Sequence, residues 1–426
     1  MSDPVLKERL NALEQKLKDL EKDPSCWGVF EFKNLQLSSE IKSGLCKALR
    51  DEARVHRASV VKVRQKLEQS GDVVDPAGSH ELVKQAWKGY TRTHRQCRLF
   101  FRECLEVIGG LAVRDMNIPM MIYHHLADEL IKGCAEDSTV MGSLAPTVPA
   151  LPETMVKPLA RIIGLRFPEW TIWTLPFTAH ELGHVVVGND DQLEAFVSEK
   201  AKEWAPGKEK KRNERYLREY LADAFGTYTM GPAYACAAIR LGLNPSTAYH
   251  DKDECPMDAK RAHVVFAILK RMNEMVVDKP YNHISERLEH DWQEMLGGIG
   301  ENPMLIESDR CRMDSLVTEI LAQFREFLRP TAMYWHGERD HTFGWLVAQG
   351  WCNKWSEQMK DRGPLKIGDI SRRSTLRDVL NAAWQCRLNH PEESDMIAEA
   401  AQALCEEIIQ KKREPAGDGG ARGVRH

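Results

Sequence analysis

Apolar residues near the start of the chain recur at helical spacing. Leucines at positions 6, 10, 13, 17 and 20 are separated by four, three, four and three residues among Lys and Glu. This is the heptad pattern of a helix with a single apolar seam. The seam is about two heptads long, and stable coiled coils usually show three or more. It therefore fits either a helix that docks on its own chain or a homodimer formed through Leu6–Leu20.

The helical pattern continues over much of the remaining chain. It covers residues 38–69, 315–327, 376–386 and 393–412. Strand signals are few, and the clearest is Trp170–Thr174, which is rich in β-branched and aromatic residues. That segment could be a buried strand or an edge strand that pairs with an extended substrate. The sequence therefore predicts a mainly α protein with at most a small sheet.

Glycine, proline and polar clusters divide the helical stretches. A turn signal lies at Asp75–Ser79, prolines recur between 146 and 152, and glycines cluster between 297 and 300. We expect an N-terminal helical region at 1–71, a central domain at 72–300, a C-terminal helical region at 301–413 and a disordered Gly-rich tail at 414–426.

Composition narrows the function classes. The 426 residues carry a net charge of −4, which gives no global positive field, so we expect neither nucleic acid nor membrane as a partner. A local basic patch is compatible with this charge balance. Eleven Cys without a CxxC pair argue for reduced thiols rather than disulfides. The N-terminal residues show no apolar leader, and no long apolar run follows. These features predict a cytoplasmic protein.

The sequence His-Glu-Leu-Gly-His at 180–184 carries the strongest chemical signal. On a helix, His180 and His184 lie at i and i+4 on one face, where both imidazoles can reach one metal ion. Glu181 then lies beside the metal-bound water as a general base. The flanking residues are uncharged and apolar, as a buried active-site helix requires. We therefore predict a Zn²⁺ site on this helix.

A catalytic zinc ion needs a third protein ligand, and two candidates compete. Asp190 lies six residues after His184, but the turn that such a ligand requires needs a glycine where this chain has Val187. Glu219 lies in a later helical segment with Asp223 four residues on. Glu219 could bind the metal while Asp223 accepts the second ring N–H of a ligand histidine. Glu219 is the preferred third ligand.

These motifs resemble the gluzincin metallopeptidases, and most closely the branch of the prenyl-protein and HtpX-like peptidases. HExxH is followed in that branch by a Glu-x-x-Ala-Asp segment, matched here at 219–223, and often by a His-Pro with an Arg five residues after the Pro. This chain has Pro256 and Arg261 at that spacing, with Cys255 in place of the His. The resemblance spans Leu175–Arg261. It implies a zincin-like catalytic core flanked by helical regions, whereas the substrates of these membrane-embedded relatives do not carry over.

The chemistry implied is zinc-dependent hydrolysis of a peptide bond in a protein or peptide substrate. A further donor should stabilise the oxyanion. Candidates are His250 and Arg261, with Tyr228 and His263 as others. Cys255 has the chemistry of a zinc ligand, but a cysteine is more often simply buried. The alternatives are a zincin-like metal-binding protein that recognises partners, and a zinc hydrolase of a non-peptide amide. The helical flanks could receive an activator.

Overall fold

A computed structural model describes most of the chain. It covers residues 4–21, 33, 35, 37, 39–72, 76–115, 122–135, 147–150, 156–157, 162–166, 171–204, 209–250, 255–275, 279–298, 305, 307–328, 332–334, 344–360 and 374–413. The chain forms two compact units. Unit 1 comprises residues 1–121 and 143–167, and unit 2 comprises residues 122–142 and 168–426.

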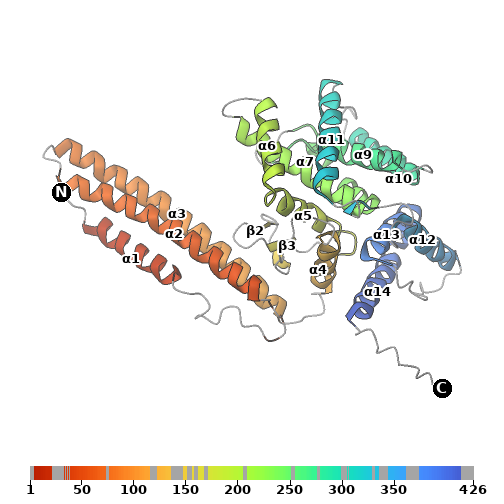
Figure 1. Ribbon diagram of the computed structural model, residues 1–426, viewed down its shortest axis with the longest axis horizontal. Coiled ribbons are helices and arrows are strands. Elements are labelled where there is room, and N and C mark those ends of the chain that lie inside the picture. The colour runs from red at the N-terminus through yellow and green to blue at the C-terminus, as the bar shows by residue number, and fades with distance from the viewer. Residues whose placement is uncertain are drawn as a thin grey trace, which may run out of the picture. The chain divides into compact units, whose positions relative to one another are not determined.

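Unit 1 is built around two long antiparallel helices. They are α2 (Ser39–Asp72) and α3 (Pro76–Asp115), which run side by side, and α1 (Pro4–Glu21) packs mainly on α2 (Figure 1). Pro76 is the first residue of α3, a position where its missing N–H costs no helical hydrogen bond. The turn predicted at Asp75–Ser79 is therefore wrong over its described residues, 76–79, which form the start of α3.

The leucine seam of α1 is used within the chain. Leu6, Leu10 and Leu17 are at most 2% exposed and belong to one apolar cluster with residues of α2 and α3. That cluster also holds Val60, Val63, Leu67, Ala86 and Cys97. The expected docking of α1 on its own chain is confirmed. A homodimer through the same seam would have to uncover these leucines.

Three short strands complete unit 1. β1 (Val148–Ala150), β2 (Val156–Lys157) and β3 (Ile162–Arg166) form a sheet in the order β1-β3-β2. β1 is parallel to β3, with Val148 opposite Gly164, and β2 is antiparallel to β3, with Val156 opposite Ile163. The sheet is small, as expected for a mainly α chain.

Unit 2 is mainly helical. Its α-helices are α4 (Ile122–Ala135), α5 (Phe177–Val187), α6 (Asp191–Trp204), α7 (Lys210–Met230), α8 (Pro232–Ala237), α9 (Asp258–Glu274), α10 (Asn282–Gly298), α11 (Glu307–Phe327), α12 (Gly344–Lys360), α13 (Leu376–Asn389) and α14 (Ser394–Arg413). Short turns of other helix types follow α8, at Ala238–Gly242 and Pro245–Thr247, and precede α14, at Pro391–Glu393.

The core of unit 2 surrounds α7. Its second half, from Tyr220 to Met230, is buried at every residue, between α5 on one side and α9 on another. Asn381 of α13 fixes the junction between α7 and α8. Its amide donates to Met230 O and its carbonyl accepts from Ala233 N–H, each at 2.9 Å. These bonds satisfy buried backbone groups at a helix break.

Two predictions differ from the structure. The strand expected at Trp170–Thr174 is wrong over its described residues, which form turns. The Thr174 hydroxyl and N–H both donate to Thr171 O, at 3.1 and 3.2 Å, so local hydrogen bonds override strand propensity. Trp170 itself lies outside the described residues, as does the tail 414–426.

The domain boundaries also fall elsewhere. The boundary expected at 71/72 separates α2 from α3, although these helices pack along each other. The boundary expected at 300/301 separates α10 from α11, although α9 packs on both. The cause is that turn residues mark a reversal of the chain as readily as the end of a domain. No helix in the described part of the chain has the length and apolar character needed to cross a bilayer.

Candidate metal centre

The HExxH segment lies on α5, which begins after Pro176. His180 and Glu181 are 7% and 6% exposed, and the helix packs closely on α7. Gly183 permits this approach, because a Cβ there would lie 2.9 Å from the Cα of Ala222 on α7. The glycine inside the motif therefore sets the distance between the two helices that carry the site.

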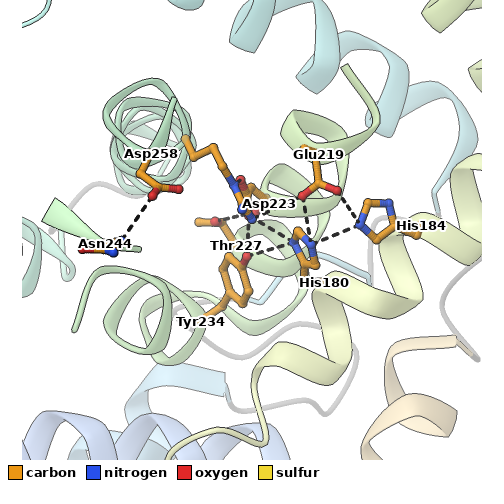
Figure 2. Close-up of polar contacts among 9 residues, drawn as sticks. His180, His184, Glu219, Asp223, Thr227, Tyr234, Asn244 and Asp258 are labelled. Carbon is orange, nitrogen blue, oxygen red and sulfur yellow. Dashed lines mark hydrogen bonds and ion pairs between the residues drawn. The ribbon is translucent and has the colours of Figure 1, made fainter. Parts of the chain in front are cut away.

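Three potential ligand atoms converge from α5 and α7 (Figure 2). His180 Nε2 and His184 Nε2 are 3.1 Å apart. The carboxylate of Glu219 completes the triangle, with Oε2 at 3.6 Å from His180 Nε2 and Oε1 at 3.4 Å from His184 Nε2. The His184 and Glu219 side chains are 21% and 18% exposed, so the triangle remains open to solvent on one side.

The other ring nitrogen of His180 faces a buried carboxylate. His180 Nδ1 is 3.0 Å from Asp223 Oδ1, and the hydroxyl of Tyr234 lies 3.1 Å from the same nitrogen. Tyr234 in turn donates to Asp223 Oδ1 at 2.6 Å. The hydroxyl proton is therefore committed to Asp223, so both groups accept from a protonated Nδ1. This arrangement leaves Nε2 of His180 as the ligand atom.

Arg261 of α9 contacts the carboxylates of both Asp223 and Glu219. Its Nε donates to Asp223 Oδ2 at 2.7 Å and a terminal nitrogen donates to Asp223 Oδ1 at 2.8 Å. The same terminal nitrogen lies 3.5 Å from Glu219 Oε2. A bidentate guanidinium holds a carboxylate in a defined plane, which here is the plane that faces His180.

Electrostatics set the charge of each ligand. Burial acts to lower the pKa of His180, but hydrogen bonds to Asp223 and Glu219 outweigh it and raise that pKa to about 10. Burial and the His180 charge lower the pKa of His184 to about 4. Burial acts to raise the pKa of Glu219, but the hydrogen bond from His180 and the Arg261 charge lower it to about 2. The same cations hold the pKa of Asp223 below its usual range against burial.

The three ligand atoms fit a zinc ion. Tetrahedral zinc takes nitrogen and carboxylate ligands at about 2.0 to 2.2 Å, so two ligand atoms of one ion stand about 3.3 to 3.6 Å apart. The two Nε2 atoms are 3.1 Å apart, and each lies 3.4 or 3.6 Å from its nearer Glu219 oxygen, Oε1 for His184 and Oε2 for His180, all at or near that range. Two histidines and one carboxylate form a donor set of catalytic zinc sites, in which the fourth position is left for water or substrate.

The structure separates the two candidates for the third ligand. Glu219 joins His180 and His184, as preferred from the sequence. Asp190 instead caps α6, where its Oδ1 accepts from Gln192 N at 3.0 Å and Leu193 N at 2.9 Å. Its position six residues after His184 therefore reflects the start of the next helix.

For three oxyanion candidates the structure records exposure or contacts outside the ligand triangle. His250 is exposed, and among the described residues it is not part of the group of His180, His184 and Glu219. Tyr228 is buried and its ring packs on Phe324, with 5.5 Å between ring centroids. His263 contacts Asp314 at 2.9 Å and lines a separate cavity of about 370 Å³ between α9, α10 and α11.

Arg261 belongs to the cluster, but not in the expected role. It was one of several candidates to stabilise the oxyanion, and two of its nitrogens are engaged by Asp223. It therefore acts through Asp223 as a positioning residue. Cys255 is partly exposed and is not part of the candidate ligand group among the described residues.

Sequence reasoning missed Tyr234. This residue lies on α8, beyond a break at Gly231 and Pro232, and its ring packs on Gly226, where a Cβ would approach the ring to 2.9 Å. The signal in the sequence was Gly226, eight residues before Tyr234, since a glycine inside a buried helix often marks the close approach of another group.

Comparison of the chain with family models, curated proteins and solved structures gives no match.

Proposed function

We propose that the chain is a zinc-dependent metallopeptidase. The observation that supports this most strongly is the triangle of His180, His184 and Glu219, whose spacing fits one tetrahedral ion and whose open side faces solvent. Bound there, zinc would polarise a scissile carbonyl and lower the pKa of water toward about 7. We also propose that the helix pair α5 and α7 is the core of a zincin-like fold.

The remaining residues would perform distinct tasks in hydrolysis. Glu181 follows His180 on α5 and would take a proton from the attacking water and deliver it to the leaving amine. Asp223 and Tyr234 would keep the proton of His180 on Nδ1, so that the ring cannot turn away from its ligand position. Arg261 would hold Asp223 ionised and oriented.

A peptide bond is the proposed substrate because the motifs at 180–184 and 219–223 resemble those of the gluzincin metallopeptidases. The cytoplasm is the proposed location, since the cysteines that the structure describes are thiols. A zinc hydrolase of non-peptide amides would use the same residues, and a partner-binding protein would not need Glu181.

The variant Glu181→Gln separates an enzyme from a binding protein. Glutamine keeps size and polarity but cannot accept the proton, so hydrolysis should fall by about 10²- to 10⁴-fold at unchanged zinc content. Glu199→Gln, an exposed change on α6, is the matched control. Each zinc-loaded protein is incubated with a peptide library derived from a proteome, and new N-termini are counted by mass spectrometry. If wild type yields no new termini, the peptidase proposal is wrong.

A further inference from the structure

Basic residues are concentrated in two neighbouring stretches of unit 1. Residues 54–66 of α2 and 84–102 of α3 together contain eleven Lys and Arg and no Asp or Glu. The stretches lie side by side (Figure 1). The His56 and Phe100 rings are 5.3 Å apart, and a Cβ at Gly89 would meet Val63 at 3.0 Å. A chain with a net charge of −4 thus carries a strongly positive segment.

Six of these residues form a row along α3. The row consists of Lys84, Lys88, Arg92, Arg95, Arg98 and Arg102, which are all exposed. Intervals of three or four residues place them on one helical face, and the rise of the helix makes the row about 27 Å long. Ala86, Cys97 and Phe100 lie on the opposite face, buried in the apolar clusters of unit 1.

Acidic neighbours form ion pairs with other basic residues and with one end of this row. Glu14 and Glu21 of α1 form ion pairs with Arg64 and Arg57 of α2. Within the row, Arg102 contacts Glu106 at 3.7 Å. No ion pair involves the other five members of the row within the part of the chain that the structure describes.

We propose that the basic row of α3 binds the phosphate backbone of nucleic acid without reading its sequence. The row presents a charge about every 5 Å, and each strand of a duplex offers a regular line of phosphates. Four of its six members are Arg, whose guanidinium binds phosphate through two nitrogens. An interfacial membrane helix instead inserts a continuous apolar face, and the face of α3 that carries Ala86, Cys97 and Phe100 is already covered by its own chain. The exposed apolar residues of α3, Leu99, Phe101 and Val113, are scattered.

This proposal reverses the expectation of no nucleic-acid partner. That expectation used the net charge, which sums over the whole chain and hides a local row. The proposal does not depend on the metal centre, since every residue that carries it lies in unit 1. Loss of zinc or of hydrolysis would leave it unchanged.

Fluorescence anisotropy of the full chain with a labelled DNA duplex and a labelled single-stranded RNA tests the row. Wild type should bind at least one probe, more weakly as NaCl rises. The variant Lys84→Gln/Lys88→Gln/Arg92→Gln should lower the slope of log K against log salt by about three and weaken binding by about 10²-fold at low salt. Arg95→Gln/Arg98→Gln should lower the slope by about two.

A matched control carries the same charge change outside the row. Lys202→Gln/Lys211→Gln/Arg325→Gln changes exposed positions on α6, α7 and α11 and should bind as wild type does. Equal weakening of nucleic-acid binding in both triple variants would show that binding depends only on the net charge, and would overturn the proposal. Absence of binding to both probes would also overturn it, as would binding only to phosphatidylserine vesicles. Circular dichroism confirms that each variant is folded.

Discussion

Tyr234 donates its hydroxyl proton to Asp223 Oδ1 at 2.6 Å, and both side chains are buried. The carboxylate that orients His180 is thereby itself oriented from two sides, by Tyr234 and by Arg261. Burial, followed by the negative charge of Asp223, raises the pKa of Tyr234 well above its usual value. The hydroxyl therefore stays protonated and remains a donor throughout the physiological range.

The variant Tyr234→Phe should weaken zinc binding while keeping the fold. Phenylalanine retains the ring that packs on Gly226 but removes one of the groups that hold His180 and Asp223. We expect zinc affinity to fall about 10-fold, and by more in Asp223→Asn, since outer partners of a ligand histidine are worth about 10- to 100-fold. Competition with a chromophoric chelator measures both values.

The control for this prediction is Tyr281→Phe. Tyr281 is also buried and donates to Tyr334 O at 3.1 Å, but it does not contact the ligand triangle. Each variant should lose about 1 kcal/mol of unfolding free energy through one buried hydrogen bond. Only Tyr234→Phe should change zinc affinity. Equal zinc affinities in the two variants would remove Tyr234 from the site.

Sequence patterns predicted the part of the site that a regular helix encodes. His180 with His184, and Glu219 with Asp223, are i and i+4 pairs, so helical geometry places each pair on one face. The distance between the two pairs of side chains depends on how closely α5 approaches α7. Gly183 permits that approach, but the sequence alone does not identify the helix that packs against this glycine.

The rest of the site depends on tertiary contacts that no local pattern records. Tyr234 reaches the cluster because Asn381, 151 residues after Met230, fixes the break between α7 and α8. Arg261 was found by its spacing from Pro256, yet its role follows from Asp223, with which it pairs. At 171–174 the strand prediction failed because threonine hydroxyls bond to the backbone locally.

Glu219→Ala should abolish tight zinc binding, whereas Asp190→Ala should leave it intact. Glu219 supplies one of three ligand atoms, but Asp190 caps α6. Loss of that cap should cost about 1 kcal/mol of unfolding free energy, so Asp190→Ala has a measurable effect of its own. Elemental analysis and urea unfolding give the two readouts. A loss of zinc in Asp190→Ala would contradict the ligand assignment.

Gly183→Ala should destabilise the protein although alanine favours helix. Helix propensity would add about 1 kcal/mol of stability, but the new Cβ would lie 2.9 Å from Ala222 Cα, and such overpacking costs about 1 to 3 kcal/mol. Because α5 must move from α7, zinc affinity should fall too. Gly350→Ala in α12 is the control, since nothing lies within 4 Å of its Cβ. It should raise the unfolding free energy, as urea unfolding would measure.

Zinc binding should release about one proton per chain at neutral pH. Without metal, a pKa of about 10 leaves His180 protonated, whereas a pKa of about 4 leaves His184 neutral. Zinc needs the unprotonated Nε2 of His180, so binding must displace that proton. Apparent affinity should therefore rise about 10-fold per pH unit between pH 6 and 9. Two histidines of ordinary pKa would give a plateau above about pH 7.

Calorimetry in two buffers of different ionisation enthalpy measures the proton count directly, and chelator competition across the same pH range measures the affinity. Asp223→Asn is the informative variant, because the hydrogen bond to that carboxylate contributes most to raising the pKa of His180 against burial. Its loss should lower this pKa, reduce the protons released near pH 8 and flatten the pH profile, while the zinc affinity itself falls. A wild-type profile already flat above pH 7, with no proton released, would show that Asp223 does not hold a charged His180.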